Sequence, residues 1–234
     1  MESENSSGNS NALRRNGNKI YYSVKNGMPE MEKRLRLLNA IDLYRQAIEC
    51  AENRDEKSAA LKNMGIANVK LGTELDQKIE FVDIKYFLKE GIACFSEGYM
   101  NGKSVKPVEW QDNIIKRTRE VLDYIEDKVA DLPIQQKISV LEECTYATTI
   151  DSVRGEYCMK LADMMYYEAL PHLKDKNYKK ILERLRDCHR PIEEASNCMQ
   201  SDENHCSEIR VRREEIMYLT CRGEFLQALS IGKL

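Results

Sequence analysis

Cysteine and histidine residues gather near the C-terminal end of the chain, at Cys188, His189, Cys198, His205 and Cys206. Thiolate and imidazole groups are ligands that zinc prefers, so these five side chains are candidate zinc ligands. Structural zinc sites usually contain tight pairs such as C-x2-C, whereas the intervals between these residues are longer. Cysteine is also a common small core residue in reduced proteins. We therefore expect these residues to pack in the core, and we expect neither a metal nor another cofactor.

The sequence carries no familiar catalytic motif. It contains no Walker loop, dinucleotide-binding glycine fingerprint, HExxH motif or nucleophile elbow. Cys188 and His189 would point about 100° apart on a helix, so they cannot easily share a hydrogen bond as nucleophile and base. The many carboxylates stand beside Lys and Arg at helical spacing, which indicates a solvated surface. We therefore expect a protein that is not an enzyme.

Basic residues form two clusters in the second half of the chain. The clusters comprise Lys174, Lys176, Lys179, Lys180, Arg184, Arg186 and Arg190, and then Arg210, Arg212 and Arg213. Such tracts could contact phosphates. Acidic residues are interleaved with them, and the net charge of the chain is −3. Because phosphate binding needs unopposed positive charge, we do not expect a nucleic acid as the partner.

The composition of the 234 residues is typical of amphipathic helices, with 32% charged and 42% hydrophobic residues. No apolar run approaches the ~20 residues of a membrane span. The polar N-terminus does not resemble a signal peptide. Eight cysteines without an export signal indicate reduced thiols. We therefore expect a cytoplasmic protein, with the nucleus as the alternative compartment.

Helices are the elements that must position these side chains. From residue 30 onward, apolar residues recur every three or four positions, and no stretch alternates with period two. We predict an all-α fold with eight to nine helices, near 30–52, 55–72, 82–100, 107–130, 134–149, 152–172, 176–199 and 203–222. Residues 1–28 are rich in Ser, Asn and Gly, which predicts a disordered tail. Within that tail, the apolar "KIYYSV" at 19–24 could form a weak first helix or strand packed on the single domain expected over 29–234.

Two glycines interrupt the otherwise helical stretch "LKNMGIANVKLG" at 61–72. Gly65 lies inside the run, where a glycine costs about 1 kcal/mol relative to alanine. A helix can need a residue without a side chain where a second helix crosses close to it. We therefore predict that Gly65 is a site of close helix packing.

This stretch resembles the first helix of a tetratricopeptide repeat, a helix pair with the patterns W-x2-L-G-x2-Y and A-x3-F-x2-A. Leu61 stands in for the Trp of the first pattern, Met64 for its Leu and Gly65 for its small residue. Asn68 departs from the aromatic position, and Gly72 ends the helix. The second pattern is matched by Ala40, Tyr44 and Ala47, and again by Gly91, Phe95 and Gly98. "YLTCRGEFLQAL" resembles the turn between the two helices, with Gly223 in the turn, Phe225 as the aromatic and Ala228 as the small residue. "KDKNYKKILERL", with Tyr178, is a weaker copy of that turn.

The resemblance implies an irregular stack of antiparallel helix pairs whose first helices line a groove for a peptide or partner helix. The exposed stripe of the helix at 55–72 would then contain Lys62, Ile66, Val69 and Lys70, with Asn63 at its edge. Some members of the family grip a C-terminal carboxylate with Lys and Asn, but Ile66 replaces one of these Asn residues, so we do not expect a full clamp. An acidic, partly apolar segment suits this stripe.

Two alternatives stay open from the sequence. The same spacings could belong to an irregular helical bundle rather than to a repeat. A helical bundle could also enclose a cavity for a small molecule and act as a sensor or an enzyme. Because catalytic motifs are absent from the sequence, we favour a non-catalytic adaptor that binds a protein segment.

Overall fold

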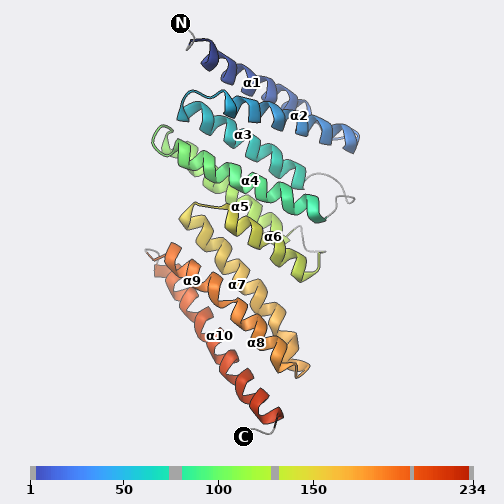
Figure 1. Ribbon diagram of the computed structural model, residues 1–234, viewed down its shortest axis with the longest axis vertical. Helices are drawn as coiled ribbons and strands as arrows, with labels where there is room; N and C mark the ends of the chain where they lie inside the picture. Colours follow the sequence, from blue (N-terminus) through green and yellow to red (C-terminus); the bar gives the residue numbers. More distant parts are fainter. Residues whose placement is uncertain (1–3, 74–80, 128–131, 201–202, 232–234) are drawn as a thin grey trace. The chain divides into compact units, whose positions relative to one another are not determined.

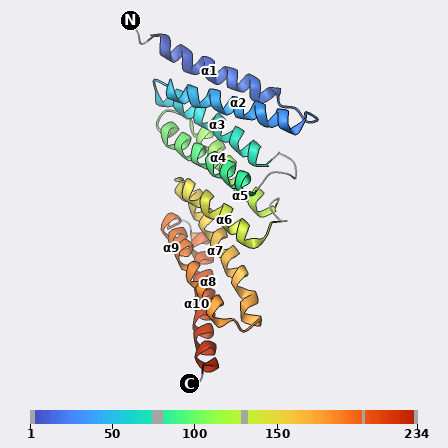
Figure 2. The same ribbon diagram turned by 45° about the vertical axis from the view of Figure 1, so that its right-hand side comes forward.

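The computed structural model describes residues 4–73, 81–127, 132–200 and 203–231 of the chain. The described residues form helices and no strand, which confirms the predicted all-α fold. The helices, shown in Figures 1 and 2, are α1 (Glu4–Ser23), α2 (Glu30–Glu49), α3 (Arg54–Thr73), α4 (Phe81–Gly102), α5 (Val108–Asp127), α6 (Ile134–Ala147), α7 (Asp151–Lys174), α8 (Tyr178–Asp187), α9 (His189–Cys198) and α10 (Glu203–Ser230). The predicted end of the helix at 107–130 lies outside the described residues.

The chain divides into two compact units where we expected one domain over 29–234. Met1–Ala130 and Tyr146–Ile150 make up the N-terminal unit, and Asp131–Thr145 and Asp151–Leu234 make up the C-terminal unit. Each unit has its own packed helices, and each is described by itself below.

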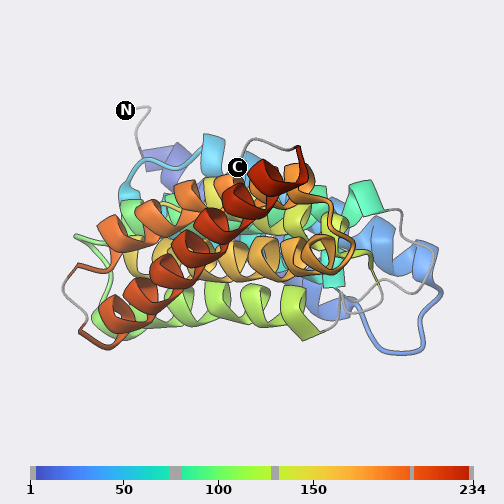
Figure 3. The ribbon, with the colours of Figure 1, turned by 90° about the horizontal axis from the view of Figure 1, so that it is seen from below.

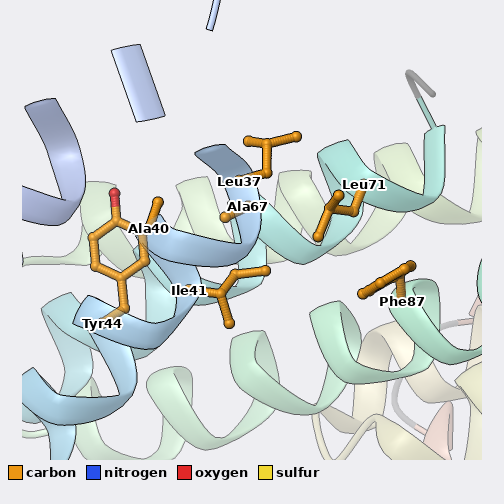
Figure 4. Close-up of a cluster of buried hydrophobic side chains, with 7 residues drawn as sticks. All are labelled: Leu37, Ala40, Ile41, Tyr44, Ala67, Leu71 and Phe87. Atoms are coloured by element: carbon orange, nitrogen blue, oxygen red, sulfur yellow. The ribbon is translucent and has the colours of Figure 1, made fainter. Parts of the chain in front are cut away.

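The helices of the N-terminal unit pack in chain order, α1 on α2, α2 on α3, α3 on α4 and α4 on α5 (Figure 1). In addition, α1 contacts α3 and α3 contacts α5. Alternate helices therefore lie next to one another, as the first helices of successive helix pairs do in a helical repeat. Figure 4 shows a cluster at the centre of this packing that joins α2, α3 and α4, namely Leu37, Ala40, Ile41, Tyr44, Ala67, Leu71 and Phe87.

Residues 1–28, which we expected to be disordered, contain the helix α1. Ser10 donates a hydrogen bond to the Ala47 carbonyl oxygen over 2.9 Å, and Tyr44 donates one to Asn18 Oδ1 over 2.9 Å. A Cβ atom at Gly17 would lie 2.6 Å from Tyr44 Cε1, so the backbone of α1 approaches that ring closely. These tertiary contacts with α2 outweigh the poor helix propensity of a segment rich in Ser, Asn and Gly.

The α3–α4 pair confirms that Gly65 is a close-packing site. A Cβ atom on Gly65 would lie 2.6 Å from Phe95 Cε1, and one on Gly91 would lie 2.6 Å from Val69 Cγ2. Phe95 is only 1% exposed. The ring therefore occupies the space that a side chain at position 65 would need, and the glycines on both helices allow the two backbones to approach.

In the C-terminal unit, α7 packs against α8 and α9, and α10 crosses the α8–α9 layer, as the view in Figure 3 shows. The sequence predicted one helix over 176–199, but this segment is divided at Cys188 into α8 and α9. Pro191 accounts for the division, because it has no backbone N–H to donate to residue 187 and its ring crowds that carbonyl group.

The predicted turn at Gly223 is wrong. Gly223 lies inside α10, and a Cβ atom there would lie 3.1 Å from Leu182 Cδ2 of α8. The absence of a side chain at Gly223 therefore allows α10 and α8 to approach closely. The helix-forming residues around Gly223 maintain the helix through this position. Phe225, predicted to be the packed aromatic, is 55% exposed. The turn predicted from the weaker copy, "KDKNYKKILERL", is confirmed in its location, because a turn just before Tyr178 joins α7 to α8.

Candidate functional site

A cleft of about 250 Å³ opens in the N-terminal unit. Its walls come mainly from α1, α3 and α5, and it is lined by Tyr21, Ile66, Val69, Lys70, Thr73, Phe95, Arg117, Glu120 and Tyr124. Three of the five residues that the sequence predicted for a groove, Ile66, Val69 and Lys70, line this cleft. The α3 face that carries them is therefore hollowed, and it is flanked by α1 and α5.

The apolar part of the cleft is shared with the core. Ile66 and Val69 are both half-buried. The Cγ2 atom of Val69 fills the space beside Gly91 of α4, so this side chain supports the α3–α4 contact as well as the cleft wall. The sequence predicted an exposed stripe, and the flanking helices cover part of it.

Lys70 lies against an aromatic ring of α1. Its Nζ atom is 5.2 Å from the centroid of the Tyr21 ring, within the range of a cation–π interaction. Tyr21 belongs to the apolar "KIYYSV" segment, and its ring forms part of the cleft wall. The ammonium group of Lys70 is thereby positioned at the edge of the cleft.

Lys62 lies two turns before Lys70 on α3, close to further positive charge. Its Nζ atom is 5.6 Å from the centroid of the Trp110 ring, and Lys106 Nζ is 5.8 Å from the same centroid. Burial, together with the nearby cations Arg117 and Lys106, lowers the pKa of Lys62. Lys106 also forms an ion pair with Asp55 at 2.7 Å. This local excess of positive charge favours a negatively charged ligand group.

Arg117 links this positive charge to the cleft, which it lines. Its Nη1 atom is 3.6 Å from Glu120 Oε2, so the ion pair between them is long. Its Nε atom is buried, and within the described part of the chain it has no hydrogen-bond partner. The guanidinium group of Arg117 thus has an N–H donor to which no described residue offers an acceptor.

Asn63 has a structural role. Its Nδ2 atom donates a hydrogen bond to Asn18 Oδ1 over 2.8 Å, and Tyr44 donates to the same oxygen. Asn18 therefore joins α1 to both α2 and α3. Of the five predicted site residues, Lys62 and Asn63 do not line the cleft. Asn63 instead helps to attach α1, which forms one wall of the cleft.

Sequence reasoning missed the residues that α1 and α5 contribute. Tyr124 is one of them, and its hydroxyl group donates to the Gly72 and Thr73 carbonyl oxygens over 3.5 and 3.4 Å. Burial raises the pKa of this phenol, so it remains a neutral donor. The apolar island around Tyr21 was a signal for a packed segment, whereas nothing in the local pattern of α5 marks Arg117 or Tyr124.

The cysteine and histidine residues near the C-terminal end do not converge. Cys188 is fully buried, and its thiol lies 3.3 Å from the Arg184 carbonyl oxygen. Burial raises the pKa of Cys188 to about 12, which disfavours the thiolate that a metal would need. Cys206, in contrast, is exposed. Among the described residues, no group of three or more His, Cys, Asp or Glu side chains is placed to hold a metal ion.

Two arginines of the basic clusters form ion pairs with carboxylates. Arg184 Nε lies 2.9 Å from Glu168 Oε2, and Arg212 Nε lies 2.6 Å from Asp163 Oδ1. Arg212 also lies over the Tyr166 ring, 4.7 Å from its centroid. These arginines are therefore paired with carboxylates, as the interleaved acidic residues of the sequence suggested.

No protein-family model matches this chain, and the curated proteins contain no match to it. No helix in the described ranges combines the length and apolar character needed to cross a membrane.

Proposed function

We propose that the chain is a non-catalytic interaction module that binds an acidic, partly apolar protein segment in the cleft of its N-terminal unit. The observation that carries the proposal is the cleft itself, which combines the apolar Ile66 and Val69 with the cations Lys70 and Arg117. Charged side chains at the edge of an apolar surface are the usual means of orienting a peptide whose apolar residues supply the anchors.

The helix arrangement supports a repeat of the tetratricopeptide type. In this interpretation α1, α3 and α5 are first helices, and α2 and α4 are second helices. Gly17 faces Tyr44 as Gly65 faces Phe95, so each small residue of a first helix meets an aromatic residue of the following helix. The resemblance implies that first helices line the ligand groove, and the cleft lies on α1, α3 and α5.

The charge distribution supports an acidic ligand. Lys62, Lys106 and Arg117 lie close enough for the two neighbouring cations to lower the pKa of Lys62. A carboxylate from a ligand would offset this repulsion, so positive charge that is unfavourable in the free protein becomes favourable in the complex. Such charges act mainly on association rate and specificity, while the apolar contacts contribute most of the affinity.

The size of the cleft favours a peptide over an enclosed small molecule. Small-molecule pockets usually have volumes of roughly 300–1,000 Å³. The cleft, at about 250 Å³, has room for one or two anchoring side chains of a longer segment. The remainder of the segment would lie along the α1, α3 and α5 surface.

A displayed library of random peptides, selected on the purified full chain, tests the proposal. We expect enriched peptides to combine Asp or Glu with Leu, Ile or Phe, and we expect the double variant Lys62→Glu/Lys70→Glu to lose that enrichment. The control is Lys174→Glu/Lys179→Glu, which makes the same change in net charge at exposed positions outside the cleft. Enrichment of peptides without acidic residues, or equal enrichment on Lys62→Glu/Lys70→Glu and on the wild type, would contradict the proposed function.

A further inference from the structure

The last helix, α10, presents apolar side chains on the face opposite to its packed side. Ile209, Ile216 and Leu219 are buried in the C-terminal unit. Val211, Tyr218, Phe225 and Leu229 are 53%, 64%, 55% and 47% exposed. At 100° per residue these four positions fall within one narrow stripe of the helix. We call the stripe formed by Val211, Glu214, Tyr218, Arg222, Phe225 and Leu229 the outer stripe of α10.

The apolar residues of the outer stripe are regularly spaced along α10. Here Val211, Tyr218 and Phe225 recur at intervals of seven residues, a spacing that aligns apolar side chains along a helix–helix seam. Exposed apolar side chains aligned along one face of a helix, with charges between them, are a candidate surface for a second helix.

The stripe is complementary to itself when a second α10 is placed against it in the antiparallel direction. We propose that two copies of this chain associate through α10, with Tyr218 at the two-fold axis. In this register, residues equally distant from Tyr218 on either side meet across the contact. Val211 then meets Phe225 of the second copy, and Glu214 meets Arg222 of the second copy.

The charges select the antiparallel direction. In an antiparallel pair, Glu214 and Arg222 form two symmetric pairs of opposite charge, one on each side of Tyr218. In a parallel pair, Glu214 would face Glu214 and Arg222 would face Arg222, which is unfavourable. Both residues are exposed on the stripe, so they can reach a second copy.

The contact is one helix wide, so we expect a weak, concentration-dependent dimer. This inference does not depend on the cleft in the N-terminal unit.

Sedimentation of the full chain over about 1 to 100 µM tests the association, since this range covers the dissociation constants expected of a small interface. We expect the weight-average mass to rise with concentration from that of a monomer toward that of a dimer. Glu214→Arg should raise the dimer dissociation constant about tenfold, because it converts two attractive pairs into two repulsive ones. Glu214→Arg combined with Arg222→Glu should restore association. A monomer throughout the range, or a double variant as weak as the single variant, would overturn the proposal.

Cross-linking by introduced thiols tests the register, in a background in which Cys206 and Cys221 are replaced by Ser. Tyr218→Cys should give a disulfide-linked dimer on mild oxidation, because the two thiols meet at the axis. Glu214→Cys is the matched control, since antiparallel copies place these thiols eight residues apart along the helix, about 12 Å, beyond the reach of a disulfide. Cross-linking of both variants would indicate a parallel pair and overturn the proposal, as would cross-linking of neither. Circular dichroism of each variant verifies that the helices are intact.

Discussion

At the scale of single residues, glycine positions determine how closely α3 and α4 approach. Gly65 faces the fully buried Phe95, and Gly91 faces Val69. Neither helix could keep this separation with a larger side chain at these positions. Glycines that would weaken an isolated helix therefore stabilise the packed α3–α4 pair.

We predict that Gly65→Leu destabilises the protein by about 1–3 kcal/mol, the usual cost of overpacking a filled core. Phe95 would have to move, because a Cβ atom at position 65 already lies 2.6 Å from its ring. Urea unfolding measures the change, with Ala12→Leu at an exposed position of α1 as the control. An unchanged or higher free energy of unfolding for Gly65→Leu would contradict close packing.

Because the pKa of Lys62 is lowered, the free energy of unfolding depends on pH in the alkaline range. Between this lowered pKa and the ordinary 10.5, the unfolded chain binds more protons than the native protein. The free energy of unfolding therefore rises with pH across that window. Lys62→Gln removes the titration, so the wild type should gain stability relative to this variant as pH increases through the window. Urea unfolding at a series of pH values measures the difference, and a difference that stays constant would contradict the effect.

Thiol reactivity should separate the buried from the exposed cysteines. Burial raises the pKa of Cys188 to about 12, whereas Cys206 and Cys221 are exposed. Because the thiolate is the reactive form, iodoacetamide at about pH 8 should modify Cys206 and Cys221 well before Cys188. Mass spectrometry of peptides after timed labelling measures the order, and denatured protein is the control. Equal rates in the native protein would contradict the buried position of Cys188.

At the scale of helices, α1 matters for the candidate site because it supplies Tyr21 and so one wall of the cleft. The Asn18 side-chain oxygen is one of the groups that attach α1, because it accepts hydrogen bonds from Asn63 and Tyr44. Removing this acceptor leaves two donors in need of partners.

We predict that Asn18→Ala lowers the free energy of unfolding by about 1–3 kcal/mol, because the buried Tyr44 hydroxyl and the half-buried Asn63 amide both lose their acceptor. Loss of protection against hydrogen exchange should be concentrated in α1, with α4 little affected. The control is Asn16→Ala, an exposed position on the same helix. Unchanged protection of α1 in Asn18→Ala would show that this helix is held by other contacts.

Most helices could be predicted from apolar spacing, while the helices and breaks that depend on contacts far along the chain could not. The predicted segments at 55–72 and 134–149 agree closely with α3 and α6. The helix α1 was missed because its composition is poor for a helix and its stability comes from α2. The break at Cys188 follows from Pro191, which sequence reasoning overlooked.

The candidate site could be predicted only in part, for a similar reason. Periodicity on one helix identified Ile66, Val69 and Lys70, which share a face of α3. It could not identify Tyr21 or Arg117, because their place in the cleft depends on how α1 and α5 pack against α3. Side chains from separate helices meet only in the folded structure.

At the scale of the whole molecule, the two units offer different surfaces. The N-terminal unit carries the cleft with its positive edge. The C-terminal unit carries the outer stripe of α10, whose apolar residues are exposed. If both proposals hold, association through α10 would present two clefts for one partner molecule, and a partner with two acidic segments would gain from this multivalency.

Direct titration of an acidic, partly apolar peptide selected on the wild type tests the central claim most directly. We predict that Lys62→Glu/Lys70→Glu weakens binding by at least about tenfold, because a favourable charge contact becomes repulsive at both positions. Stability should change little, since exposed or half-exposed charges contribute little to it, and Lys174→Glu/Lys179→Glu should bind as the wild type does. A folded Lys62→Glu/Lys70→Glu protein with wild-type affinity for the peptide would contradict the account, because the cleft on α3 would then not be the binding surface.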